Sequence, residues 1–281
     1  MVDFTQHAAG VAVALANGSV ERGDVLIGAD GLHSTIRARL FGRRPPRYAG
    51  YTAWRAVVQP NRDLLPADTG FEAWGCGARF GCAHIRDGRI YWFAVRNALA
   101  GAQYGPLGSP TGPRAALLRC FGDWQSPVPE LIAETAEAAI RRDDIHDRSP
   151  LPGPWGTGCI TLLGDAAHPM TPNLGQGACQ AIEDAVTLAG CLAEADRSDP
   201  ATALRRYEDR RRSRVNGIVR RSRMFGRIGQ VENPLLCRLR DVVAAAVPVD
   251  MQMRQLLRII GDDPPAGGRP DLGDAGKHRG R

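Results

Sequence analysis

The stretch TLLGDAAHPMTPNLGQG, residues 161–177, decides how the rest of the chain is interpreted. A run of β-branched residues and leucine ends at a Gly-Asp pair, a proline-rich loop follows, and a Gly-Gln-Gly triplet opens a long alanine-rich segment. This order predicts a buried strand at 159–164, a stiff loop and then a helix. It favours an α/β fold whose ligand site lies at the carboxyl end of that strand.

The residue types in this stretch suit a particular ligand chemistry. Asp165 stands at the end of the predicted strand, where its carboxylate can accept hydrogen bonds from a sugar or ribityl hydroxyl. Pro169 and Pro172 stiffen the loop, while Gly175 and Gly177 allow close approach of a planar ligand and leave helix N–H groups free. The positive end of the helix then favours an anion, such as a reduced flavin ring. The alternative is a plain strand–loop–helix connection in which glycine and proline only shape the turn.

Upstream, residues 10–29 (GVAVALANGSVERGDVLIGA) predict a hairpin around an Asn-Gly turn that leads into a buried strand, Asp24–Ala29. The segment DGLHSTIRARLFG follows, with a sharp turn at Asp30-Gly31. Ser34 is an acceptable N-cap, so a short helix is expected from there to Phe41.

Between these two regions, residues 48–97 are strand-like, and four of the five tryptophans lie between positions 54 and 124. They predict an antiparallel sheet, with two helices following at 113–141. Strands and helices alternate on either side of it, so we expect an α/β body with an inserted antiparallel layer. Three residues of this sheet, namely Arg55, Arg79 and Trp92, are candidates for substrate contact or for structural roles, because their faces are not fixed by the sequence.

Two long helices are expected at 176–195 and 201–229, followed by two shorter helices and a polar, disordered tail from 262. The segment 204–229 is rich in arginine and has apolar residues at near-helical spacing, including Leu204, Tyr207, Val215, Ile218, Phe225 and Ile228. The favoured interpretation is an apolar stripe packed on the body, with arginines solvated or paired. A phosphate-binding face is the minority interpretation, so no nucleic-acid partner is predicted.

The composition is that of an ordinary globular protein: 281 residues, 43% hydrophobic and 23% charged, with net charge +6. No apolar run approaches the roughly 18 residues of a membrane span, and no signal peptide is evident. Seven scattered cysteines without a C-x-x-C pair indicate reduced thiols, a cytoplasmic location and no metal site.

Two long strings of the chain resemble signatures of a known family. DVLIGADGLHSTIR resembles the second, and CITLLGDAAHPMTPNLGQGACQAIEDAVTLAGCL the third, FAD signature of the FAD-dependent aromatic hydroxylases, which are class A flavoprotein monooxygenases. That family includes urate, salicylate and 3-hydroxybenzoate hydroxylases and zeaxanthin epoxidase. The resemblance runs from about Gly10 to Phe225 and includes RYAGYTAWR and YEDRRRSRV.

The resemblance implies a partial FAD-binding Rossmann-like domain of the glutathione-reductase type, an inserted antiparallel β-sheet substrate layer and C-terminal helices. The expected boundaries are 1–47 and 146–200 for the FAD-binding domain, 48–145 for the substrate domain, 201–261 for the C-terminal helices and 262–281 for the tail.

The resemblance also implies that Asp30 and Asp165 lie at one rim of the sheet, facing a common cleft, and it implies roles for residues. Asp165 would hold the ribityl chain, and Pro172 would lie beside the reactive carbon of the isoalloxazine ring. His168 is a candidate acid near the flavin, although a loop histidine more often binds a neighbouring group. The full set assigned to FAD and, for the first motif, to NAD(P)H handling is Asp30, Gly31, Ser34, Arg37, Gly164, Asp165, Pro172, Asn173, Gly175, Gln176 and Gly177.

The activity implied by the resemblance is a monooxygenase reaction on a small aromatic or unsaturated substrate. NAD(P)H reduces FAD, O₂ adds to give a flavin hydroperoxide, and one oxygen atom hydroxylates or epoxidises the substrate over the 48–97 sheet. The alternative is a non-catalytic or partner-completed binding module of the same fold.

Members of the family begin with a βαβ unit carrying Gly-x-Gly-x-x-Gly for the FAD pyrophosphate. The nearest string here, GCGARFG at 75–81, has the wrong spacing. A truncated gene product, a split enzyme completed by another polypeptide and a degenerate protein are the three explanations. We expect the chain by itself to bind FAD weakly and to oxidise no NAD(P)H.

Overall fold

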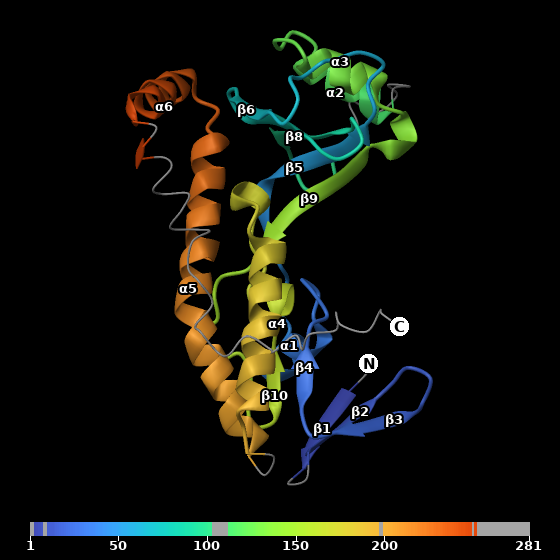
Figure 1. The fold of residues 1–281 in the computed structure, drawn as a ribbon, viewed down its shortest axis with the longest axis vertical. Helices are drawn as coiled ribbons and strands as arrows, with labels where there is room; N and C mark the ends of the chain where they lie inside the picture. Colours follow the sequence, from blue (N-terminus) through green and yellow to red (C-terminus); the bar gives the residue numbers. More distant parts are fainter. Residues whose placement is uncertain (1–2, 8–9, 103–111, 197–198, 249, 252–281) are drawn as a thin grey trace, which may run out of the picture.

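A computed structural model gives the fold (Figure 1). Two long helices, α4 (Gly177–Ala193) and α5 (Pro200–Gly229), pack against each other along the molecule. A five-stranded sheet lies towards one end of this pair, and the short strands lie towards the other. The structure describes residues 3–7, 10–102, 112–196, 199–248 and 250–251.

The two strands that precede the motifs are neighbours. β4 (Leu26–Gly28) and β10 (Ile160–Leu162) pair in parallel, with Gly28 opposite Leu162. Parallel neighbours end at the same edge of a sheet, so the turn after β4 and the loop after β10 leave at one rim. A Cβ on Gly28 would come within 2.6 Å of Leu162 Cδ2, so glycine is needed for this close approach. The expectation that both motifs share a rim is confirmed.

The N-terminal strands form a separate three-stranded antiparallel sheet in the order β1-β2-β3. The predicted hairpin is present as β2 (Gly10–Ala14) and β3 (Val20–Gly23). A further strand, β1 (Asp3–His7), pairs with β2 and was not predicted. The first motif continues into α1 (Thr35–Phe41), which begins one residue after its expected N-cap.

The predicted antiparallel sheet is also present, in the order β6-β7-β8-β5-β9. Helices α2 (Pro113–Phe121) and α3 (Val128–Glu134) cover one face, and their side chains join a core with Phe80, Trp92 and other sheet residues. The fold is thus α/β with an inserted antiparallel layer. The strands are β5 (Arg47–Val58), β6 (Gly70–Trp74), β7 (Ala78–His84), β8 (Ile90–Asn97) and β9 (Arg141–Asp147).

The apolar residues expected to line the buried stripe of α5 are buried as far as Ile218, and beyond it the buried positions are Val219, Ser222, Gly226 and Gly229. Phe225 and Ile228, predicted to pack on the body, are instead 36% and 42% exposed. The chain then turns into α6 (Pro234–Ala246). The predicted tail at 262–281 and most of the second short helix lie outside the described residues. In the described part of the chain, no helix is long and apolar enough to cross a membrane.

Three short 3₁₀ turns complete the described structure and shape the loops. They are η1 (Glu137–Ala139), η2 (Gly164–Ala166) and η3 (Pro172–Leu174), and the last two lie in the loop after β10.

Candidate functional site

The turn after β4 is organised by its own side chains. Asp30 Oδ2 accepts the backbone N–H of Thr35 at 2.7 Å and that of the next residue at 3.3 Å. Ser34 caps α1, because its Oγ accepts the N–H of Arg37 at 2.9 Å. Gly31 has φ +74°, a conformation that favours glycine. In this structure the direct contacts of Asp30 and Ser34 therefore support the start of α1.

Arg37 connects the two motifs. Its Nη1 donates to the carbonyl oxygens of Ala166 at 2.9 Å and Ala167 at 2.7 Å, in the loop after β10. The side chain is buried, and desolvation together with the positive charge of Arg148 lowers its pKa to about 10. Arg37 therefore remains charged at neutral pH. It fixes one rim loop against the other.

Asp165 is the acid that this rim presents to solvent. It lies on η2, just past the end of β10, and its carboxylate has no hydrogen bond to any described residue. Partial desolvation raises its pKa, and the nearby His168 acts in the opposite direction. The loop is set close to α4, because a Cβ on Gly164 would lie 3.1 Å from the Cβ of Ala181. The arrangement leaves an accessible acceptor beside the start of α4.

The N-terminus of α4 is open. Pro172 begins η3, and Gly175 ends it in the left-handed region with φ 64°. Gln176 is the N-cap, but its side chain makes no capping bond. The backbone N–H groups of residues 177–179 donate to no group among the described residues. Free N–H groups at the positive end of a helix are suited to an anionic ligand atom.

Asn173 ties η3 to α5 and to the five-stranded sheet. Its Nδ2 lies 2.9 Å from Tyr51 Oη, from Thr171 Oγ1 and from the backbone oxygen of Ser222. A Cβ on Gly226 would come within 2.4 Å of the same nitrogen, so the helix approaches closely only because it carries glycine there. The side chain of Asn173 is therefore committed within the protein, and only its backbone is left for a ligand.

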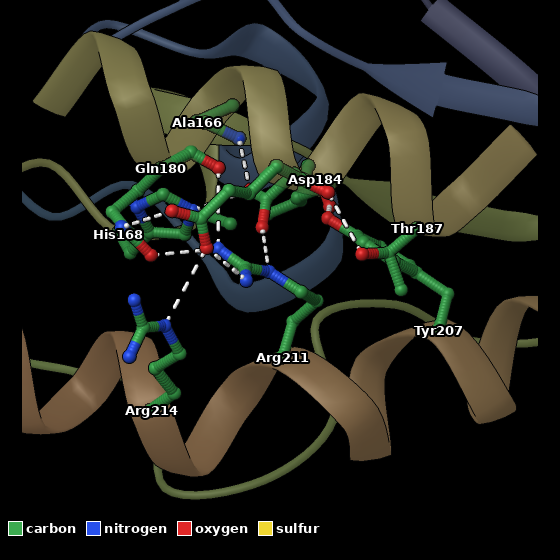
Figure 2. Close-up of polar contacts among 12 residues, drawn as sticks. Ala166, His168, Gln180, Asp184, Thr187, Tyr207, Arg211 and Arg214 are labelled. Carbon is green, nitrogen blue, oxygen red and sulfur yellow. Dashed lines mark hydrogen bonds and ion pairs between the residues drawn. The ribbon is translucent and has the colours of Figure 1, made fainter. Parts of the chain in front are cut away.

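A buried polar network joins the loop after β10 to α4 and α5 (Figure 2). His168, 2% exposed, is bonded through Nε2 to Asp184 Oδ2 at 2.6 Å. The same carboxylate accepts the N–H of Gly164 at 3.1 Å and Arg211 Nε at 2.8 Å. Burial acts to raise the pKa of Asp184, but the hydrogen bonds and charges of His168 and Arg211 outweigh it, so the pKa is lowered. We assign His168 to this support.

Arg79 joins the five-stranded sheet to the same loop. It is 3% exposed and donates from Nη2 to Asn173 Oδ1 at 2.6 Å, from Nε to Gln230 at 2.9 Å and from Nη1 to Glu72 at 3.0 Å. All three nitrogens are committed, so Arg79 positions the loop and the end of α5 against the sheet.

Trp92 lies on the other face of the sheet from Arg79. It is fully buried in the core beneath α2 and α3, and its Nε1 donates to Thr135 Oγ1 at 2.9 Å. Side chains alternate along a strand, so Trp92 cannot share the face that carries Arg79 and Arg55. Its predicted place among the substrate residues is corrected to the core.

The face opposite α2 and α3 carries a polar and aromatic surface. Arg55 is paired with Asp143 and hydrogen-bonded to Tyr91, and burial raises the pKa of that tyrosine. Phe93 lies flat over Gly81, where a Cβ would come within 2.4 Å of the ring. A planar molecule can rest on such a face.

The chain resembles known flavoproteins in sequence and in fold. The profile of the family described as FAD binding domain matches residues 131–222. The aurachin C monooxygenase/isomerase of Stigmatella aurantiaca is 48% identical over 232 residues, which cover 83% of this chain and 58% of that protein. Klebsiella pneumoniae HpxO, solved with FAD and uric acid, superposes with a TM-score of 0.82 at 33% identity, over 92% of this chain and 65% of that one.

The chain belongs to the FAD-dependent aromatic hydroxylase family. The chloroplastic zeaxanthin epoxidase of Arabidopsis thaliana is also similar, with 39% identity over 236 residues, 80% of this chain and 34% of that protein. A salicylate hydroxylase shares the fold, with a TM-score of 0.69 at 24% identity. This hydroxylase-family chain spans about three-fifths of the aurachin C enzyme and one-third of the epoxidase.

A basic cavity of about 730 Å³ adjoins the first motif of this hydroxylase-family chain. No aspartate or glutamate lines it, and two of its arginines, Arg43 and Arg44, have no side-chain partner among the described residues. No cluster of three or more His, Cys, Asp or Glu side chains in the described ranges is placed to hold a metal ion. The arginines that line the cavity are Arg37, Arg43, Arg44, Arg47 and Arg148.

Sequence reasoning missed the residues that support this hydroxylase-family site. Asp184 and Arg211 lie on different helices, so no local motif joins them. A signal was present, since two adjacent acids stand in the otherwise apolar segment AIEDAVTLAG and require partners when buried. Tyr91 and Phe93 were missed because their face depends on the strand register.

Proposed function

We propose that this chain belongs to an FAD-dependent monooxygenase that hydroxylates or epoxidises a small aromatic or unsaturated substrate, using NAD(P)H and O₂. One observation supports it above the others: an unpartnered carboxylate at Asp165 lies on the same rim as the open N-terminus of α4. FAD, when bound, would supply the oxidation–reduction chemistry between NAD(P)H and O₂.

The rim fits the flavin half of FAD by two tests. Asp165 is free to accept hydrogen bonds from ribityl hydroxyls, because no described residue uses its carboxylate. The N–H groups of residues 177–179 are free to face the pyrimidine edge of the ring, and Gly175 presents no side chain to obstruct it. The pyrophosphate half would require a Gly-x-Gly-x-x-Gly unit such as the family carries, and the 281 residues contain none.

We assign substrate binding to the open face of the five-stranded sheet. Phe93 gives a flat apolar surface, and Arg55 and Tyr91 give polar groups beside it. These features suit a planar, electron-rich molecule that bears an oxygen atom. Arg79 bonds Asn173 in the loop after β10, and we assign to it the role of fixing the distance between this face and that loop.

The basic cavity beside α1 suits the electron donor. NAD(P)H carries at least two phosphate charges, and an arginine-lined cavity without carboxylates attracts such an anion. All seven cysteines are free in the structure, in keeping with the proposal that the protein works in the cytoplasm.

The test of the cofactor assignment is Asp165→Asn, with Asp24→Asn as the matched control. Asp24 is also exposed and without a side-chain partner among the described residues. Loss of hydrogen bonds to a charged acceptor, about 1.5–3 kcal/mol, should weaken FAD binding by about 10- to 100-fold. Fluorescence titration of FAD into the purified chain, with the βαβ segment of a relative added where needed, measures it. Equal affinities for the two variants would remove Asp165 from the site.

A further inference from the structure

The end of α5 and the whole of α6 expose an unusual amount of apolar surface. Of the sixteen large apolar side chains that are exposed in the described structure, nine lie between residues 224 and 251. On α6 they include Leu235, 73% exposed, and Val242, 68% exposed. Soluble surfaces scatter such residues singly, so a concentration of them marks an interaction surface.

Helix α6 turns its apolar stripe away from the protein. The exposed residues recur at i, i+1, i+4, i+7 and i+8, which places them on one face of the helix. The buried residues are Cys237 and Arg240, on the opposite face, and Arg240 contacts the ring of Trp74. The helix therefore packs on the body through its more polar side. The stripe consists of Leu235, Leu236, Leu239, Val242 and Val243.

The last turns of α5 carry a similar mixture with a strong positive charge. From 220 to 231 the sequence contains four arginines and no acid. Exposed Met224, Phe225 and Ile228 alternate with exposed arginines. Four arginines have no side-chain partner among the described residues: Arg220, Arg221 and Arg227 of α5, and Arg238 of α6.

We propose that this surface, formed by residues 220–228 of α5 and the apolar stripe of α6, docks the protein on an anionic lipid bilayer. Helices with an apolar face and flanking arginines lie in the headgroup region, with their apolar side chains in the acyl boundary and their cations at the phosphates. At 13 residues, α6 is suited to lying on a membrane surface.

Charge favours lipid over the other occupants. A second copy docked by two-fold symmetry would bring the unpaired arginines of both copies together, which like-charge repulsion opposes. A nucleic acid would neutralise the arginines but leave Phe225 and the α6 stripe against phosphate or water. An anionic bilayer satisfies both kinds of side chain. Residues 220–228 adjoin the loop after β10 through Ser222 and Gly226, but the proposed surface uses other, exposed side chains, so the proposal does not rest on the flavin assignment.

The test is sedimentation of the purified chain with vesicles of phosphatidylcholine, with and without phosphatidylglycerol. We expect binding to the mixed vesicles that weakens with salt. Leu235→Asp/Leu239→Asp should lower the partition coefficient by at least about tenfold, since charges replace two exposed leucines that would enter the acyl boundary. The matched control is Val20→Asp/Ile85→Asp, two exposed apolar residues outside this surface, which should leave binding unchanged.

A third variant, Arg221→Gln/Arg227→Gln, should reduce binding to the mixed vesicles but not to pure phosphatidylcholine. Circular dichroism confirms that each variant is folded, and light scattering gives its mass. Wild-type failure to bind mixed vesicles, or equal loss in the Val20/Ile85 control, would overturn the proposal. So would a dimer that Leu235→Asp/Leu239→Asp dissolves, because the second copy would then be the occupant.

Discussion

The two halves of α5 use the same residue type in opposite ways. In the first half the arginines are paired: Arg205 with Glu208, and Arg211 with Glu183 and Asp184. In the second half Arg220, Arg221 and Arg227 have no partner in the described part of the chain. A count of basic residues cannot separate these roles. The difference lies in what faces each half: the acids of α4 beside the first, solvent beside much of the second.

The largest expected effect is at Arg211. Arg211→Met should destabilise the fold by about 3–5 kcal/mol, because it removes a cationic partner of the fully buried carboxylate of Asp184. The matched change in the second half, Arg221→Met, should cost less than about 0.5 kcal/mol, as for most exposed positions. Urea denaturation measures both. Similar losses for the two variants would show that the halves do not differ energetically.

A smaller effect should appear in the acid dependence of stability. The pKa of Asp184 is lower in the folded protein than the ordinary value of about 3.9, so its ionised form stabilises the fold above that pH. This contribution is lost as pH falls from about 3.9 towards the lower folded-state pKa. The difference in unfolding free energy between wild type and Asp184→Asn should therefore be constant near neutral pH and shrink in acid.

The same measurement checks this second prediction over a pH series. A difference that stays constant down to pH of about 2 would mean that Asp184 is not held ionised by the first half of α5. The isosteric amide keeps the volume of the side chain, so that packing changes little.

The smallest effect is expected at Arg223, an arginine in the second half of α5 that does have a partner. Arg223 is paired with the buried carboxylate of Asp147 at 2.7 Å, but Arg47 contacts that carboxylate as well. Arg223→Met should therefore cost only about 0.5–1 kcal/mol, measured by the same denaturation. Arg227→Met serves as the unpaired control. A loss as large as that at Arg211 would show that Arg47 does not compensate.

The parts of the fold that local pattern determines were predictable from the sequence. The strand, loop and helix at 159–193 follow from residue spacing, as do the Ser34 cap and the shared rim of β4 and β10. The exposure of Phe225 and Ile228 was not predictable, because helical spacing defines a face of the helix but not what packs against that face. The Asp184–Arg211 pair requires two helices to be placed side by side, and no single segment encodes that.

Strand parity explains why the substrate face was not assigned. Arg55 and Trp92 belong to adjacent strands, and their faces depend on the register that sets Arg55 opposite Phe93. A shift of one residue would exchange the two faces. The cofactor role of the rim remains a prediction that Asp165→Asn tests, and the substrate role of the sheet also remains a prediction.

The amide of Asn173 has a consequence for how substrate range can diverge. Through this one side chain the loop after β10 is bonded to Tyr51 and Arg79 on the sheet and to Ser222 on α5. The loop therefore cannot slide along the sheet without breaking bonds to both neighbours. The proposed oxygen transfer would be sensitive to errors of about 1 Å, so a fixed spacing would be an advantage during evolution. Substitutions on the open face can then alter which molecule is accepted while the reacting distance is inherited unchanged.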